Sequence, residues 1–407
     1  MLRFRGEHPS HAVTSLDTAG GLDLVHRGTE GESADHQKGD PHEQLDDGET
    51  PETVEDVALR RRIDLTFPAH PADPSPSSRP SDPARARSSA RGYSLHRFTR
   101  ILRIMGQPLY LRGLAYTVGD GVPLTEIEDG DLEQVQIYTK LGLRFFRKSP
   151  LGLGELCNRS VGETMRSSGV DPAEVGAVLL ATTVNSIHAV GLDYPEVAQI
   201  LGDHGLGDAK LYGVTLSKCS NLSAALELGS SLLRANEYSQ VLVIVGDKCA
   251  RDRDRFMDSC ESILSDGAMS FVLSRTEGPY ELKYLATSSD LSHLSKTFGV
   301  LEFVDNSVKN LGKLWRAIPP DHPRERMEKV FWGNYNMLIQ RNLMRELGVK
   351  KETFYLDNLA RMGHVFSCDA LINLSDYAAS TPVPAGTSFT CLTVGYFRWG
   401  CFVLQKT

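Results

Sequence analysis

The stretch KCSNLSAALELGSSLLRANEYSQVLVIVGD, residues 218–247, joins a helix pattern to a strand pattern and decides the fold class. Ala and Leu recur at helical spacing in its first two thirds, which predicts a helix with one apolar face. Its last eight residues form a nearly continuous apolar run, which is typical of a strand covered by helices on both faces. The runs AVLLATT at 177–183 and LYGVTL at 211–216 predict two further strands before it.

The same alternation continues on both sides of this stretch. The sequence predicts helices over Asp131–Leu143, Leu151–Ser168, Tyr194–Leu201, Asn336–Gly348 and Cys368–Ala379. It predicts further strands at AMSFVLS (268–274) and PYELKYLAT (279–287), and two closing strands in SFTCLTVGYFRWGCFVLQ (388–405). Alternating strands and helices favour an α/β protein with a mainly parallel sheet, and their recurrence indicates two similar halves around one core.

Residues 1–104 have a different composition. An acidic segment that is poor in large apolar residues is followed by one rich in Pro, Ser and Arg, and the first 95 residues carry a net charge of −6. Such segments bury too little apolar surface to offset the entropy lost on ordering, so we expect a disordered extension. Met105 precedes the first expected strand at 109–116 and is a candidate start of the protein.

Composition excludes several classes of protein. The 312 residues after Leu95 have a net charge of only −2, and they hold no run of interleaved basic and aromatic residues, so no nucleic-acid partner is expected. No apolar stretch is long enough for a membrane span, and no secretory signal is present, so we expect a cytoplasmic protein. The seven cysteines contain no CxxC pair, which indicates neither a zinc site nor a disulfide framework.

Cys219 is the candidate nucleophile. It lies where a strand gives way to a long helix, and exposed N–H groups and the helix dipole at such a place favour a thiolate and a developing oxyanion. The alternative is a buried cysteine that packs as a small apolar residue.

Five segments together resemble the ketoacyl synthase III branch of the thiolase superfamily, over roughly residues 109–406. They are AVLLATT, the KCSN segment, VLVIVGD, ILSDGAMSFVL and GYFRWGCFVLQ, in the order and at the spacing of that family. The resemblance implies a thiolase fold, a five-layered αβαβα arrangement of two related βαβαβαββ halves, here residues 105–277 and 278–407. It also implies a homodimer and an acyl group carried as a thioester on Cys219.

The chain departs from that family at two catalytic positions. The segment GNYN places Gly333, with Asn334 beside it, where condensing members have a histidine that assists malonyl decarboxylation. The segment GHVFSCD places His364 where those members have asparagine, and Asp369 follows five residues later. A thiol nucleophile needs a base, and the base needs an orienting partner, so we expect His364 and Asp369 to act with Cys219. The alternatives are a surface histidine and an aspartate that interacts with a helix dipole.

We therefore expect an acyltransferase of natural-product biosynthesis. An acyl group would pass from coenzyme A or an acyl-carrier protein through Cys219 to a small-molecule acceptor, with neither metal nor redox cofactor implied. One alternative is a condensing enzyme that loads the starter unit of a polyketide or fatty acid. A second is a non-catalytic subunit that keeps the fold for pairing with an active homologue.

Other residues are weaker candidates. The family supplies part of its oxyanion hole by backbone N–H groups, here expected at Cys219 and near Gly395 or Tyr396. His188 follows a buried strand and is a candidate for the mouth of the site. The run RDRDRF at 251–256 is either a solvated face or a docking point for an acidic carrier protein. The cysteines at 249, 260, 368, 391 and 401 are expected in the core.

Overall fold

The computed structural model describes residues 107–407, except 129, 184–188, 236, 258–260 and 293–299. The expected extension, His188 and Cys260 therefore lie outside the described residues.

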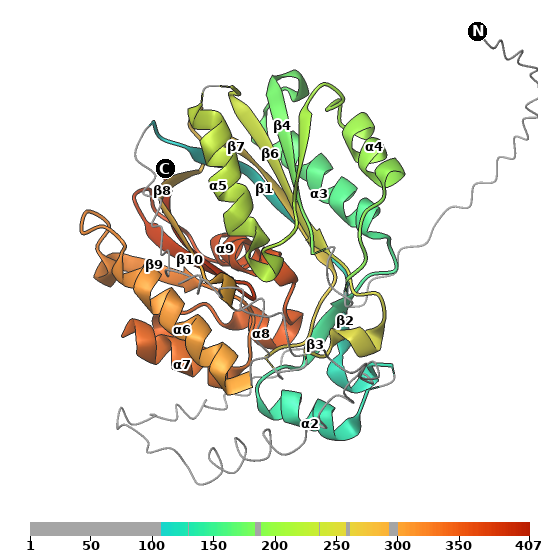
Figure 1. Cartoon of the computed structure of the whole chain (residues 1–407), viewed down its shortest axis with the longest axis vertical. Coiled ribbons are helices and arrows are strands. Elements are labelled where there is room, and N and C mark those ends of the chain that lie inside the picture. Colours follow the sequence, from blue (N-terminus) through green and yellow to red (C-terminus); the bar gives the residue numbers. More distant parts are fainter. Residues whose placement is uncertain (1–106, 129, 184–188, 236, 258–260, 293–299) are drawn as a thin grey trace, which may run out of the picture. The chain divides into compact units, whose positions relative to one another are not determined.

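The main sheet has nine strands in the order β5-β4-β6-β7-β1-β8-β11-β10-β9 (Figure 1). The strands are β1 (Tyr110–Val118), β4 (Val175–Ala181), β5 (Lys210–Val214), β6 (Gln240–Asp247), β7 (Gly267–Ser274), β8 (Tyr280–Ser289), β9 (Met327–Phe331), β10 (Ser388–Val394) and β11 (Arg398–Lys406). β6 pairs with β4 in parallel and with β7 antiparallel, and β7 pairs antiparallel with β1. In the second half β10 pairs in the same way with β9 and β11, and β11 with β8.

This pairing confirms two related halves and corrects the expectation of a mainly parallel sheet. The halves meet where β1 pairs with β8 through only two residue pairs, at Tyr110 and Leu111. Antiparallel pairs predominate in the described sheet because the last two strands of each half follow one another directly, without a crossover helix between them.

Helices complete five layers. The outer face of the first half carries α3 (Leu153–Ser168) and α4 (Tyr194–Asp203), and that of the second half carries α6 (Val300–Arg316) and α7 (Met337–Leu347). Between the two half-sheets lie α5 (Asn221–Arg234) and α9 (Asp369–Ser380). A smaller unit beside them comprises β2 (Asp120–Pro123), α2 (Leu132–Lys140), β3 (Phe145–Lys148) and α8 (Asp357–Met362). The chain has the thiolase-type αβαβα architecture expected from its sequence.

Local signals place the helix ends close to the expected bounds. Asp131 caps α2 by accepting a hydrogen bond from the Glu133 N–H, and Asn336 caps α7 by accepting from two N–H groups. Gly169 ends α3 in the left-handed conformation, with φ 63°.

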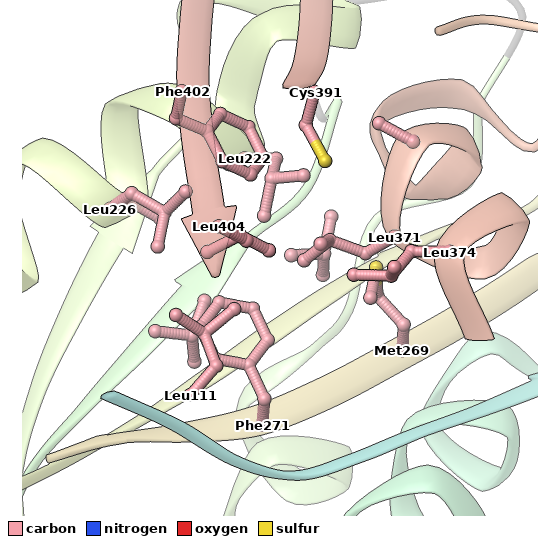
Figure 2. Close-up of a cluster of buried hydrophobic side chains, with 14 of the residues drawn as sticks. Leu111, Leu222, Leu226, Met269, Phe271, Leu371, Leu374, Cys391, Phe402 and Leu404 are labelled. Carbon is pink, nitrogen blue, oxygen red and sulfur yellow. The ribbon is translucent and has the colours of Figure 1, made fainter. Parts of the chain in front are cut away.

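The central layer is the largest apolar core. Leu222 and Leu226 of α5 meet Leu371 and Leu374 of α9 between Phe271 and Phe402, which come from opposite half-sheets (Figure 2). Full burial of a leucine contributes about 1.5–3 kcal/mol. This packing fixes the starts of both central helices. The candidate catalytic residues lie at these starts or on the turns just before them.

Replacing Leu226, which is fully buried, with Ala should lower the free energy of unfolding by about 2–5 kcal/mol, because the cavity left in the central layer cannot fully collapse. Leu132→Ala is the matched control, since that side chain is 75% exposed and its loss should change the free energy by no more than about 0.5 kcal/mol. Urea unfolding measures both. Equal losses would contradict the central packing.

Candidate active site

Cys219 lies on a strained turn before α5. The turn Lys218–Ser220 is a single 3₁₀ turn, and Lys218 has φ 48°, which is unusual for a residue with a side chain. Asn221 holds the turn by accepting from the Ser217 N–H at 2.9 Å and donating to the Thr182 carbonyl at 3.0 Å. The Cys219 side chain is partly exposed, so the thiol is fixed in place but accessible.

His364 lies on the loop that leads into α9, and its backbone is fixed. Its N–H donates to the Ile263 carbonyl at 2.8 Å, and its carbonyl accepts from the Ser265 N–H at 2.9 Å. Gly363 makes this possible, because it has φ 66° and a Cβ there would lie 2.8 Å from the Ile263 carbonyl oxygen. The imidazole is 1% exposed.

Asp369 is the first residue of α9 and orients the imidazole. Its Oδ2 lies 2.5 Å from Nδ1 of His364 and also accepts from the Asn334 N–H at 2.7 Å. Its Oδ1 accepts from the Val365 N–H at 2.7 Å. Two backbone N–H groups donate to the Asp369 carboxylate at the start of a helix, so this carboxylate is the acceptor in its bond with Nδ1 of His364.

The imidazole of His364 lies close enough to Cys219 for the two side chains to interact. Burial of His364 opposes protonation, but its interactions with Asp369 and Cys219 outweigh burial and hold the pKa of His364 well above its usual value. Nε2 makes no hydrogen bond of ordinary geometry to any residue that the structure describes. The arrangement is that of a nucleophile, a base and an orienting carboxylate.

Asn334 and Gly333 lie beside the triad without a side chain directed at the thiol. The Asn334 amide donates to the Gly363 carbonyl at 2.8 Å and accepts from the Asn373 amide at 3.1 Å, so it fixes the loop that carries His364. Gly333 packs against the ring of Tyr335.

Of the expected oxyanion donors, Gly395 does not fit. Its N–H donates to the Arg398 carbonyl at 2.7 Å and is occupied in a turn between β10 and β11. Glycine at position 395 instead lets this turn pack closely against Ser217, because a Cβ there would lie 2.1 Å from the Ser217 carbonyl oxygen. Tyr396 lies beside the same turn, with its ring 5.2 Å from Nζ of Lys218. The backbone N–H of Cys219 stays a predicted donor.

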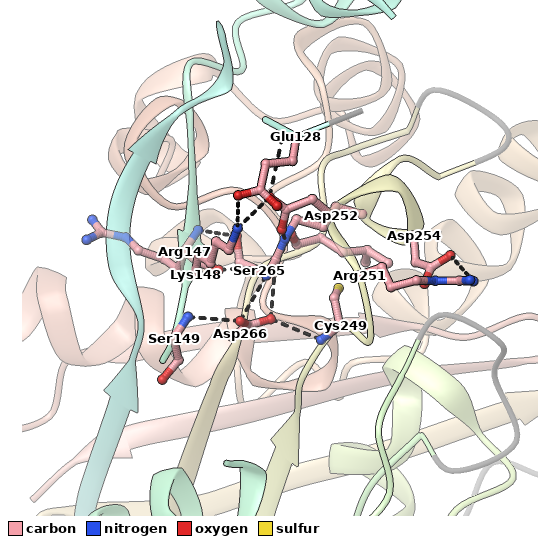
Figure 3. Close-up of polar contacts among 12 residues, drawn as sticks. Glu128, Arg147, Lys148, Ser149, Cys249, Arg251, Asp252, Asp254, Ser265 and Asp266 are labelled. Carbon is pink, nitrogen blue, oxygen red and sulfur yellow. Dashed lines mark hydrogen bonds and ion pairs between the residues drawn. The ribbon is translucent and has the colours of Figure 1, made fainter. Parts of the chain in front are cut away.

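The run RDRDRF is largely not a solvated face. Arg255 is 2% exposed and forms a bidentate pair with Asp266, with both N–O distances 2.9 Å, and a further bond to Asp252. Figure 3 shows the carboxylates of Asp252 and Asp266 in this network. These carboxylates raise the pKa of Arg255 despite its burial. Only Arg251 and Arg253 of the five charged residues are exposed.

This buried network supports the loop that carries His364. Asp266 also accepts from the N–H groups of Ser149 and Cys249, at 2.9 and 3.0 Å. The preceding residue, Ser265, bonds to the His364 carbonyl through its N–H and to the Met362 carbonyl through its hydroxyl at 2.6 Å. The charges in RDRDRF therefore act structurally.

The expected core cysteines that the structure describes, at positions 249, 368, 391 and 401, are buried. Burial raises the pKa of all four thiols. Cys219 is the only described cysteine with a partly exposed side chain. Among the described cysteines, it alone is both accessible to a substrate and close to a candidate base, His364.

Sequence reasoning missed three residues around the site. Ser367 accepts from the Leu222 N–H at 2.8 Å and joins the two central helix starts. Asp247 ends β6 in full burial, which raises its pKa to about 7 against the opposing hydrogen bonds from Thr183. Tyr335 packs its ring 4.9 Å from that of His364. A carboxylate ending the apolar run VLVIVGD was the available signal for Asp247, whereas Ser367 and Tyr335 gave none.

Within the described part of the chain, no group of three His, Cys, Asp or Glu side chains is arranged to hold a metal ion. No described helix has the length and hydrophobicity needed to span a membrane.

Part of the chain is similar in sequence to one family of known proteins. The model of 3-oxoacyl-[acyl-carrier-protein (ACP)] synthase III matches residues 215–290, which include Cys219. The β-ketoacyl-[acyl-carrier-protein] synthase III of Porphyromonas gingivalis is 27% identical over 170 residues, which are 39% of this chain and 49% of that protein. The chain spans about half the length of the curated relatives it matches.

Solved structures resemble a larger part of the chain. The 3-oxoacyl-[acyl-carrier-protein] synthase III from Aquifex aeolicus has a TM-score of 0.61 and 18% identity, and the match covers 74% of this chain and all of that one. The acyltransferase ChlB3 also has a TM-score of 0.61, with 15% identity over 74% of this chain and 98% of that one. Both likenesses show the thiolase fold.

The raised pKa of His364 predicts a stability that depends on pH. The folded protein holds this proton more tightly than the unfolded chain, so the stabilisation is full below the unfolded-state pKa of 6.5 and is lost as pH rises through the folded-state pKa. The unfolding free energy of the wild type minus that of His364→Gln should therefore fall as pH increases above about 6.5. Denaturant titrations at several pH values measure it. A difference that is constant or rises with pH would mean that the folded imidazole is neutral.

Proposed function

We propose that this chain, a ketoacyl synthase III-like member of the thiolase superfamily, is an acyltransferase of natural-product biosynthesis. It takes an acyl group from coenzyme A or an acyl-carrier protein onto Cys219 and delivers it to a small-molecule acceptor. The observation that carries the proposal is the imidazole of His364, which Asp369 holds at Nδ1 and which lies close enough to Cys219 to interact with it. The matched synthase from Porphyromonas gingivalis supports acyl thioester chemistry.

The first half-reaction uses the charged pair. The Cys219 thiolate attacks the carbonyl carbon of the donor thioester, and a carbon–sulfur bond forms to Cys219. The tetrahedral oxyanion develops near the start of α5, where backbone N–H groups and the helix dipole stabilise negative charge. As the donor's own carbon–sulfur bond breaks, its leaving thiolate takes the proton from Nε2 of His364.

The second half-reaction uses the imidazole as a base. Once Cys219 is acylated it carries no charge, so one of the two charges that raise the pKa of His364 is gone. The neutral imidazole takes a proton from the acceptor's hydroxyl or amine, which attacks the acyl carbon. The tetrahedral intermediate collapses, and the thiolate of Cys219 leaves and is paired again with the imidazolium.

Transfer to a hydroxyl or amine is favoured over condensation by what surrounds the thiol. Decarboxylation of a malonyl thioester develops an enolate that needs a hydrogen-bond donor, but Gly333 has no side chain and the Asn334 amide is committed to Gly363 and Asn373. Starter-unit condensation remains the second candidate, because it would use the same donor and the same Cys219. A non-catalytic role is opposed by the bonded pair of His364 and Asp369 beside an accessible thiol.

We also propose a cytoplasmic homodimer. β5 is an edge strand of the described sheet, so one side of it has no paired backbone. Leu211 on this strand is 44% exposed and Leu216 just beyond it is 68% exposed. An apolar edge of this kind suits pairing with a second copy.

The acyl-enzyme tests the function directly. After incubation with acetyl-CoA or an acetylated carrier protein, the intact mass of the wild type should increase by one acetyl group, and Cys219→Ala should show no increase. Cys249→Ala is the matched control, because that buried cysteine has no part in the proposal and its loss should leave the adduct unchanged. His364→Ala should slow acyl transfer by about 10²–10⁴-fold, the contribution of a general base.

Asp369→Asn should slow transfer less, and adding it to His364→Ala should cause no further loss, since the two residues act as a unit. An acetyl adduct that persists in Cys219→Ala, or a wild type that never forms one with either donor, would refute the proposed function.

A further inference from the structure

Gly333 is a glycine for reasons of space. It is not among the residues with positive φ, so its backbone conformation would admit a side chain. A Cβ at this position would, however, lie 2.3 Å from Cε2 and 2.9 Å from Cδ2 of Tyr335. Real Cβ atoms do not approach other atoms so closely. The ring of Tyr335 therefore occupies the volume that any side chain at position 333 would enter.

The ring of Tyr335 is held in place and cannot give way cheaply. It is 6% exposed and packs 5.0 Å from the Trp332 ring and 4.9 Å from the His364 ring. Its backbone N–H donates to the Gly333 carbonyl at 2.7 Å. The Gln340 amide donates to the carbonyls of both Gly333 and Tyr335, at 2.9 and 3.1 Å. The short turn is thus fixed at both ends.

Tyr335 also separates the catalytic imidazole from a small cavity. His364 lies against the ring, and the ring in turn lines a cavity of about 10 Å³, which also contacts Trp332 and Ser307. This space is at the lower limit for one water molecule. The indole N–H of Trp332 and the hydroxyl of Ser307 are buried without hydrogen-bond partners among the described residues. The ring of Tyr335 therefore lies between the imidazole of His364 and this cavity.

We propose that Tyr335 is a specificity-determining residue: its ring keeps position 333 free of a side chain and so denies a malonyl thioester the hydrogen-bond donor that its decarboxylation needs. This inference rests on the proposed function and deepens it by naming the class of acceptor that the site rejects. The ring fills the volume in which a donor to an enolate would stand, and it adds no charge to pair with a carboxylate. Acceptors that present only a hydroxyl or an amine need no such volume.

Four variants test the steric claim, and they need no substrate. Gly333→His should destabilise the fold, because the new side chain meets the Tyr335 ring. Combining it with Tyr335→Ala should restore the melting temperature to that of Tyr335→Ala alone. Combining it with Tyr335→Phe, which keeps the ring and loses only the hydroxyl, should leave the destabilisation in place. If Gly333→His is equally destabilising beside tyrosine, phenylalanine and alanine, the coupling of the two positions is wrong.

The same variants test acceptor choice. In malonyl decarboxylation a carbon–carbon bond breaks, carbon dioxide leaves, and the enolate takes a proton from solvent to give the acetyl thioester. Carbon dioxide release from a malonyl thioester should increase at least about tenfold over wild type only when Gly333→His and Tyr335→Ala are combined, since one well-placed hydrogen-bond donor contributes at least this much. Release that is unchanged in a stable double variant would overturn the inference.

The outcomes separate this inference from the proposed function. The acetyl adduct on Cys219 is measured in every variant. If the wild type forms no adduct, the proposed function fails, and the melting temperatures still decide whether Tyr335 blocks position 333. If the adduct forms throughout, but Tyr335→Ala does not relieve the destabilisation by Gly333→His and the double variant releases no more carbon dioxide than wild type, the assignment of Tyr335 fails alone.

Discussion

The hydrogen-bonded pair of His364 and Asp369 is the interaction on which the rest of the site depends. A buried imidazolium and a buried carboxylate each lose hydration, and their attraction offsets that loss only when further hydrogen bonds satisfy them. Here the Asp369 oxygens also accept from the N–H groups of Asn334 and Val365. The loops before α7 and α9 are thereby joined at the carboxylate that positions the base.

The duplicated architecture brings the nucleophile to this pair. Each central helix is preceded by a 3₁₀ turn that starts with an unusual backbone, Lys218 with φ 48° before α5 and Phe366 with φ 46° before α9. The two turns pack together, and Ser367 of one accepts from the Leu222 N–H that follows the other. Equivalent turns of the two halves thus meet at the site: Cys219 lies on one, and His364 and Asp369 lie just before and just after the other. Gene duplication gives a simple account of why one site draws on both halves.

Much of this arrangement was predictable from local signals. The helix and strand periods placed most elements, and the spacing of His364 and Asp369 across a loop and a helix start predicted their contact. β9 was missed because its sequence MEKVF holds adjacent charges and no apolar run. The helix α6 was also missed. Whether neighbouring strands run parallel or antiparallel depends on which strands pair in the fold. The periodicity of the sequence locates strands but does not show their partners.

The burial of Arg255 and the position of Tyr335 could not be predicted for the same reason. RDRDRF has the composition of a solvated face, but bonds to Asp266, eleven residues away, and to the carbonyls of Arg147 and Leu264 hold Arg255 inside. Tyr335 follows Gly333 by two residues, but nothing in that spacing indicates that the ring folds back over the glycine. Contacts made by the whole fold decide both cases.

The central claim is that His364 is an imidazolium poised between Asp369 and Cys219. NMR titration of the imidazole, with its signals assigned through His364→Gln, measures the protonation state directly. The account predicts that the ring stays protonated at pH 7 in the free protein, and that its pKa falls when Cys219 is acetylated or replaced by Ala, because one of the two stabilising charges is then removed. A ring that is neutral at pH 7, or a pKa that is the same with and without the Cys219 thiol, would contradict it.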